Sequence, residues 1–165
     1  MLTQPDLDSP SVDFLQAESA AQIAQARELF VEYAHSLGFS LCFQNFDKEL
    51  AELPGHYVPP SGRLLLAEFH HHLAGCVALH KLEDGICEMK RLYLRPQFRG
   101  KRLGLALAER IIAEARQIGY RHMRLDTVES VMKDAVAMYR KLGFREISPY
   151  CSTPIPSALY MELRL

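Results

Sequence analysis

The stretch "QFRGKRLG" (97–104) joins an apolar run, "RLYL" (91–94), to the helical sequence "LALAERIIAEA" (105–115). Proteins often hold phosphate at a glycine turn between a strand and a helix. The helix N-terminus offers about four unpaired N–H groups and the positive end of a dipole. This turn has no Lys-Ser or Lys-Thr pair after its second glycine and no Gly-x-Gly, which argues against a Walker loop and a dinucleotide fingerprint.

The composition of the turn suits an anion. Gly100 lets an anion approach the backbone closely, and Arg99, Lys101 and Arg102 add positive charge. On spacing alone, a plain glycine turn with a solvated basic cluster is an equally good interpretation. The neighbouring elements have to decide between the two.

The segments around the turn alternate between strand-like and helical patterns. Short apolar runs predict strands at 13–18, 63–69, 73–80, 86–94, 122–128, 144–147 and 157–165. Three- and four-residue spacing predicts helices at 19–38, 46–53, about 101–118 and 131–143. The short links "HHH" and "KLEDG" favour antiparallel hairpins. The order predicts one α+β domain over 1–165, with a central mixed, mostly antiparallel sheet and about four helices.

The three longer helices each have a predicted apolar face. These faces are Ile23, Ala26, Phe30 and Ala34; then Leu103, Leu107, Ile111, Ala115 and Ile118; and finally Val131, Ala135, Met138 and Leu142.

Composition is that of an ordinary globular protein. Apolar residues make up 48% and charged residues 24% of the 165 residues, and a net charge of −1 gives no basic field for nucleic acid. No apolar run approaches the ~20 residues that span a bilayer, and the first residues lack the pattern of a signal peptide. We therefore expect a cytoplasmic protein without nucleic-acid or membrane partners. Its four cysteines, Cys42, Cys76, Cys87 and Cys151, are expected to be reduced. The sequence leaves a homodimer through the final strands open.

The combination of "EMKRLYLRPQFRGKRLGLAL" (88–107), a following strand and "MYRKLGF" (138–144) resembles the GNAT family of acetyl-CoA-dependent N-acetyltransferases. In that family, Gln/Arg-x-x-Gly-x-Gly/Ala opens the long helix and binds the coenzyme A pyrophosphate. Gln97 and Gly100 match this pattern, whereas Arg102 departs from it, so we expect altered loop geometry rather than lost binding. The resemblance implies acetyl transfer, without a metal, to a primary amine of a small or amino-acid-like molecule.

The resemblance also implies which residues hold acetyl-CoA. The loop and the helix start would bind pyrophosphate through backbone amides. The strand before them would splay and pair with the pantetheine arm, and a main-chain N–H within 92–94 would face the oxyanion. The residues implied are Leu92, Tyr93, Leu94, Arg99, Gly100, Lys101, Arg102, Leu103, Gly104 and Leu105.

The chemistry needs a proton acceptor and a proton donor. A lysine-like amine is neutral in only about one molecule in 2,500 at pH 7, and a thiolate departs more readily with a donor. By resemblance, Tyr139 lies by the sulfur as general acid; its alternative role is packing at the core edge. Some family members use a glutamate at the position of Glu88 as the base. The alternatives are that Glu88 pairs with Lys90 or faces solvent, and Asp126 is the reserve candidate for the base.

Two polar segments have competing interpretations. The run "HHH" (70–72), with His80 nearby, falls at a predicted hairpin, so we predict a solvated turn rather than a metal site. The polar, proline-rich stretch 45–60 would wall the acceptor pocket through His56 or Tyr57 by resemblance. An ordinary connecting loop is equally consistent.

Two departures from the family pattern keep a second function open. Arg102 replaces a small residue in the loop, and Met132 stands where many members have asparagine, which removes one side-chain contact to the coenzyme. A non-catalytic acyl-CoA-binding sensor of the same fold is therefore the alternative to the enzyme.

Overall fold

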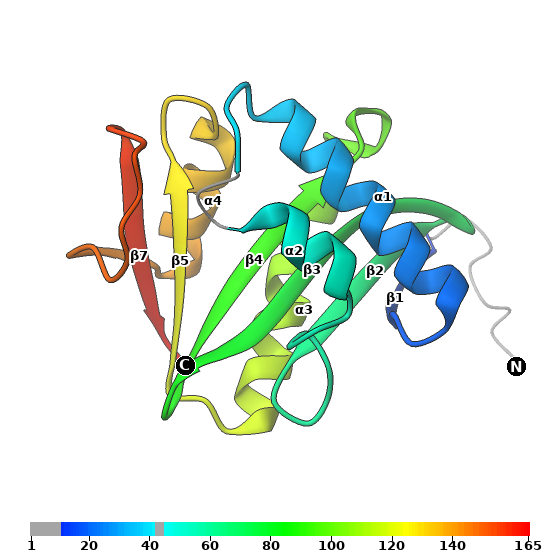
Figure 1. Ribbon diagram of the computed structural model, residues 1–165, viewed down its shortest axis with the longest axis horizontal. Helices are drawn as coiled ribbons and strands as arrows, with labels where there is room; N and C mark the ends of the chain where they lie inside the picture. Colours follow the sequence, from blue (N-terminus) through cyan, green and yellow to red (C-terminus); the bar gives the residue numbers. More distant parts are fainter. Residues whose placement is uncertain (1–10, 42–44) are drawn as a thin grey trace, which may run out of the picture.

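The computed structural model describes residues 11–41 and 45–165, which form one seven-stranded sheet with helices on both faces (Figure 1). Cys42 lies outside the described residues; Cys76, Cys87 and Cys151 are free thiols. The strands are β1 (Val12–Gln16), β2 (Arg63–Phe69), β3 (His72–Glu83), β4 (Ile86–Leu94), β5 (His122–Val128), β6 (Arg145–Ile147) and β7 (Ala158–Arg164). The helices are α1 (Ala20–Ser36), α2 (Phe46–Glu52), α3 (Leu103–Ile118) and α4 (Lys133–Leu142), with a short 3-10 turn, η2 (Pro96–Phe98).

The sheet is mixed and mostly antiparallel, as predicted. Its strand order is β1-β2-β3-β4-β5-β7-β6, and β4 and β5 are the parallel pair. The hairpins β2–β3 and β3–β4 are antiparallel, which confirms the prediction from their short links. The predicted α+β class is therefore confirmed.

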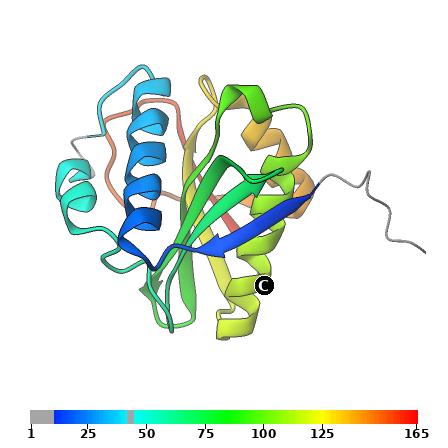
Figure 2. The ribbon, with the colours of Figure 1, turned by 90° about the vertical axis from the view of Figure 1, so that its right-hand side faces the viewer.

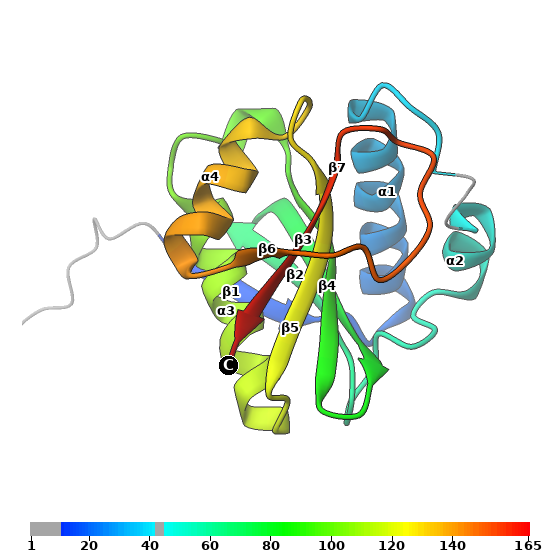
Figure 3. The same cartoon turned by 90° about the vertical axis from the view of Figure 1, so that its left-hand side faces the viewer.

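Two apolar cores lie on opposite faces of the sheet. Helices α1 and α2 cover one face and α3 and α4 cover the other (Figures 2 and 3). Leu107 and Ile111 of α3 are fully buried in one core, and Phe30 of α1 is fully buried in the other. The apolar faces predicted for α1 and α3 are thus the faces that pack.

Strands β4 and β5 pair over a short distance at the centre of the sheet. Their parallel register joins Ile86–Glu88 to His122–Arg124, and the two strands then diverge (Figure 1). On the other side of β4, the register with β3 shifts between Cys76 and Ala78, where Arg91 has a φ of 60°. A bulge of this kind bends a strand and increases its twist. It accompanies the divergence of β4 from β5.

Helix α3 begins two residues later than predicted. Gly100 has a φ of 80° and Arg102 a φ of 61°, so the backbone before Leu103 is left-handed at two positions. Residues with left-handed backbone angles cannot belong to a right-handed helix, and this conformation suits glycine better than arginine. The turn is therefore part of the loop rather than of the helix.

The apolar face predicted for α4 was wrong at its first residue. The helix begins at Lys133, so Val131 precedes it and is 47% exposed. The buried residues of α4 are Val136 and Tyr139. This places Tyr139 on the side of the helix that faces the sheet.

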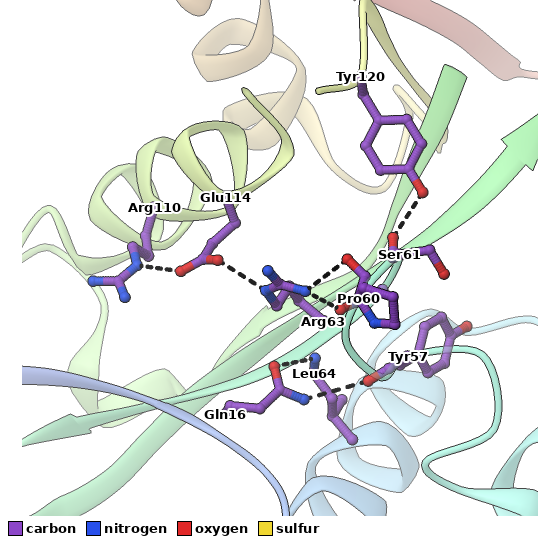
Figure 4. A network of polar contacts seen from close by, with 10 residues as sticks. Gln16, Tyr57, Pro60, Ser61, Arg63, Leu64, Arg110, Glu114 and Tyr120 are labelled. Carbon is purple, nitrogen blue, oxygen red and sulfur yellow. Dashed lines mark hydrogen bonds and ion pairs between the residues drawn. The ribbon is translucent and has the colours of Figure 1, made fainter. Parts of the chain in front are cut away.

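Hydrogen bonds tie the loop 54–62 to the elements around it (Figure 4). Tyr120 donates a hydrogen bond to the carbonyl of Ser61 at 2.7 Å, and the Gln16 amide donates to the carbonyl of Tyr57 at 3.4 Å. Arg63, which begins β2, pairs with Glu114 of α3 at 2.8 Å. These contacts position the Tyr57 side chain beside the end of α2.

Candidate active site

A long groove runs past the end of β4, the starts of α3 and α4, and the end of α1. Its volume is about 680 Å³. All of the residues predicted to hold acetyl-CoA line it except Lys101, whose ammonium lies 5.7 Å from the centre of the Phe69 ring. The lining residues among them are Leu92, Tyr93, Leu94, Arg99, Gly100, Arg102, Leu103, Gly104 and Leu105.

Two glycines on the wall of this groove leave the backbone uncovered by side chains. A Cβ added at Gly100 would have no atom within 4 Å, so it would stand in open space beside the groove. A Cβ at Gly104 would lie 3.5 Å from Leu94, in ordinary contact. Backbone at the start of α3 is thus accessible to a ligand, which is the arrangement an anion needs at a helix N-terminus.

A second cavity, here called the channel, opens where β4 and β5 diverge. Residues 89–92 of β4 and 125–128 of β5 line it, together with Tyr139 of α4 and Thr153. Several residues line both the channel and the groove, so the two adjoin; these are Tyr33, Leu37, Leu92, Met132 and Ala135.

Tyr139 lies in the core and at the channel at the same time. Its side chain is 6% exposed and packs against Phe144, with ring centres 5.6 Å apart. Burial raises the pKa of Tyr139 well above its usual value. The phenol therefore keeps its proton at neutral pH and can act as a donor.

Glu88 is a buried carboxylate with both oxygens engaged. It is 6% exposed, which is inconsistent with the solvent-facing alternative. His80 Nε2 lies 2.8 Å from Oε1, and the Tyr150 hydroxyl donates to Oε2 at 2.6 Å. Burial alone would raise the pKa of Glu88, but His80, the charge of Lys90 and Tyr150 outweigh it and lower that pKa.

Asp126 lies on β5, the strand that diverges from the strand of Glu88. It lines the channel and a further cavity of about 240 Å³, here called the acceptor cavity, with Glu88, Lys90 and Tyr150. Burial raises the pKa of Asp126; Lys90 opposes the shift and the negative charge of Glu88 adds to it. The pKa of Asp126 is thus displaced upward from its ordinary value, whereas that of Glu88 is displaced downward.

A third cavity lies beside α2, and it includes part of the stretch predicted to wall the acceptor pocket. His56 and Tyr57 line it with His80 and Lys90. The Tyr57 hydroxyl donates to Glu49, which also accepts from Arg91 Nε at 2.9 Å. Lys90 lines this cavity, the channel and the acceptor cavity.

The comparisons with known proteins agree with this geometry. Residues 23–144 match the model of the acetyltransferase (GNAT) family. The chain belongs to the GNAT family. This GNAT protein is 44% identical over 139 residues to an uncharacterized N-acetyltransferase of Schizosaccharomyces pombe, a match that covers 83% of this chain and 85% of the relative.

Two solved structures have the same fold. A Salmonella typhimurium protein, yncA, solved with its cofactor acetyl-CoA, superposes with a TM-score of 0.65 at 20% identity over 93% of each chain. PaiA N-acetyltransferase of Thermoplasma acidophilum, solved with coenzyme A, gives a TM-score of 0.71 at 19% identity over 94% of this chain and 99% of its own. The predicted family and enzyme class are confirmed: the chain is an acetyl-CoA-dependent N-acetyltransferase.

Two residues of the site were not assigned to it from the sequence. His80 was considered only with the run 70–72, but its place opposite Glu88 in the β3–β4 register brings the two side chains together. Tyr150 lies in an irregular segment between β6 and β7, where periodicity carries no signal. The hairpin register could have found His80, whereas local sequence offered nothing for Tyr150.

Within the residues that the structure describes, no group of three His, Cys, Asp and Glu side chains is placed to hold a metal ion. Over the same residues, no helix is long and apolar enough to cross a membrane.

Proposed function

We propose that this GNAT protein transfers the acetyl group of acetyl-CoA to the primary amine of a small or amino-acid-like molecule by direct attack. The observation that carries the proposal is the channel between β4 and β5. It adjoins the groove on one side and shares Lys90 and Asp126 with the acceptor cavity on the other. A thioester and an amine can meet there without a covalent enzyme intermediate.

The groove fits an elongated, anionic acyl donor. Arg99, Arg102 and Lys133 give it positive side chains, and the open space at Gly100 allows close approach to the backbone. Leu92 lines both the groove and the channel, and Tyr93 and Leu94 continue along the groove. A main-chain N–H from this segment would stabilise the developing oxyanion.

Tyr139 is the proposed proton donor. Its phenol lines the channel, and its raised pKa keeps the proton available for the departing thiolate. The same side chain packs in the core, so donor and packing roles are compatible in one residue.

Asp126 is the first candidate for the proton acceptor, and Glu88 is the second. Asp126 lines both cavities through which the amine would pass, and its raised pKa suits a base better than a lowered one. Glu88 is held by His80 and Tyr150, an arrangement that supports a role in ordering the acceptor cavity.

The test is release of free thiol from acetyl-CoA over a panel of primary amines, combined with calorimetry of acetyl-CoA binding. We expect tight binding and thiol release that depends on the added amine. Tight binding without turnover on any amine would overturn the proposal and indicate the acyl-CoA sensor instead.

A further inference from the structure

We propose that the acceptor amine also carries a carboxylate, as an amino acid does, and that Lys90 binds this carboxylate. The inference rests on the proposed function, because it names the class of acceptor for the same site. It comes from the place of Lys90, which is the residue common to the channel, the acceptor cavity and the cavity beside α2.

Lys90 brings a largely buried positive charge to this junction. Its side chain is 16% exposed, although lysine usually lies at the surface. A buried ammonium needs acceptors for its three N–H donors, because removing it from water is otherwise costly. A ligand that supplies oxygen atoms at this point would satisfy that need.

The ion pair that Lys90 makes does not use those donors. Glu88 Oε1 lies 3.9 Å from the Lys90 ammonium, which is beyond hydrogen-bond distance. The same oxygen is 2.8 Å from His80, and the other oxygen accepts from Tyr150 at 2.6 Å. Glu88 therefore holds Lys90 by charge at a distance while its closer partners occupy the carboxylate.

The neighbouring arginine has a different role. Arg91 also lines the channel, but its Nε is 2.9 Å from Glu49, and its guanidinium lies over the rings of Tyr33 and Phe46. These contacts fix α1 and α2 against β4. Lys90 is thus the cation better placed to recognise a small molecule.

An amino acid matches the charges on the two diverging strands. Asp126 and Lys90 line the same two cavities, so an amine directed to Asp126 would place a nearby carboxylate toward Lys90. An amine without the carboxylate would leave the Lys90 donors unmatched, and such a mismatch is penalised more strongly than a missing apolar contact.

The experiment compares matched acceptors in the parent and in Lys90→Met. Each α-amino acid is assayed beside its α-carboxamide and its decarboxylated amine. We expect kcat/KM of the parent to favour the acid by about tenfold or more, and Lys90→Met to lose this preference while keeping the KM for acetyl-CoA. A carboxamide lowers the pKa of its amine and so increases the neutral fraction, hence amine basicity cannot produce a preference for the acid.

Lys81→Met is the matched control, because Lys81 of β3 is half-exposed and pairs at 2.7 Å with Asp84 on the turn that follows the strand. It should keep the preference of the parent. Lys90→Arg retains the charge and should keep most of the preference, which covers the case in which Lys90→Met does not fold. Equal use of acid and carboxamide by the parent, or an unchanged preference in folded Lys90→Met, would overturn the inference.

Binding separates this inference from the proposed function. Calorimetry with coenzyme A present compares the affinity of the parent for each acid and its carboxamide. If no amine is acetylated but the acid still binds more tightly, and Lys90→Met abolishes the difference, the inference holds and the proposed catalysis fails. If the acid has no advantage in binding or turnover, the inference itself fails.

Discussion

Glu88 on β4 and Asp126 on β5 line the same cavity, and their pKa values are displaced in opposite directions. Burial raises the pKa of Asp126, whereas the contacts with His80, Lys90 and Tyr150 outweigh burial at Glu88. The charge of Glu88 also contributes to the raised pKa of Asp126. The two carboxyls are therefore coupled, and substitutions at them should have different kinetic effects.

Asp126→Asn should lower kcat/KM by about 10²–10⁴-fold, the usual range for loss of a general base. The remaining rate should rise with pH as free amine accumulates. Glu88→Gln removes a negative charge, so it should lower the pKa of Asp126 and move the acid side of the pH–rate profile to lower pH. The measurement is kcat/KM against pH for the parent and both variants. A larger loss in Glu88→Gln, with the profile of the parent retained by Asp126→Asn, would make Glu88 the base.

The pKa shifts of Glu88 and Asp126 also predict that the two carboxyls make the stability of the fold depend on pH in opposite ways. The folded pKa of Glu88 lies below its ordinary value of 4.5, so its stabilising contribution is present above that value and is lost as pH falls through the folded pKa. The folded pKa of Asp126 is raised from 3.8, so stability is lost as pH rises from that value through the folded pKa. Urea unfolding at a series of pH values provides the measurement.

In that series, the destabilisation caused by Glu88→Gln should shrink as the medium becomes more acidic. The free energy of unfolding of Asp126→Asn relative to the parent should instead increase as pH rises. Parallel pH curves for a variant and the parent would contradict the pKa shift assigned to that residue.

Gly100→Val should weaken acetyl-CoA binding more than tenfold, because the side chain would stand beside the groove at a left-handed position. Gly119→Val is the control. Gly119 ends the same helix with a φ of 105°, and its Cβ would also meet nothing within 4 Å. Both variants should lose stability, but only Gly100→Val should lose affinity in calorimetry. Equal affinities in two folded variants would remove the loop from the donor site.

Tyr139→Phe should reduce kcat by about 10²-fold or more and change acetyl-CoA affinity by only a few-fold, because the ring is kept and the hydroxyl is deleted. The loss should shrink with acyl donors whose leaving thiol is more acidic, since these need less protonation. Tyr120→Phe removes a hydroxyl that bonds to Ser61 outside the channel, so it should leave kcat near the parent value. An unchanged kcat in Tyr139→Phe would assign Tyr139 to packing alone.

Local patterns predicted much of this molecule. Strands at 63–69, 86–94 and 122–128 were predicted with the bounds that the structure gives. The loop residues around Gly100 line one groove because they are adjacent in sequence. Val131 was misplaced because three- and four-residue spacing continues past the start of a helix, and spacing alone does not show where the backbone changes direction.

The acceptor cavity could not be predicted in the same way, because it is formed by contacts that local sequence does not encode. Glu88, Asp126 and Tyr150 come from three distant segments, and their meeting depends on strand order and on the path of an irregular loop. The opposite pKa shifts of Glu88 and Asp126 result from these tertiary contacts and from burial. The family resemblance therefore placed Glu88 before Asp126, because the buried environments by which the two carboxylates differ are not visible in the sequence.

The short parallel pairing of Ile86–Glu88 with His122–Arg124 makes the centre of this sheet a seam between two halves of the protein. Apolar packing under α3 crosses the seam, whereas the buried core under α1 and α2 draws on residues 17–93 alone. A molecule bound in the groove and the channel touches both halves and acts as a clamp. A free ligand concentration of 100 times Kd would add about 2.7 kcal/mol to the free energy of unfolding. The lifetime of the folded enzyme would thus follow the supply of the compound that it consumes.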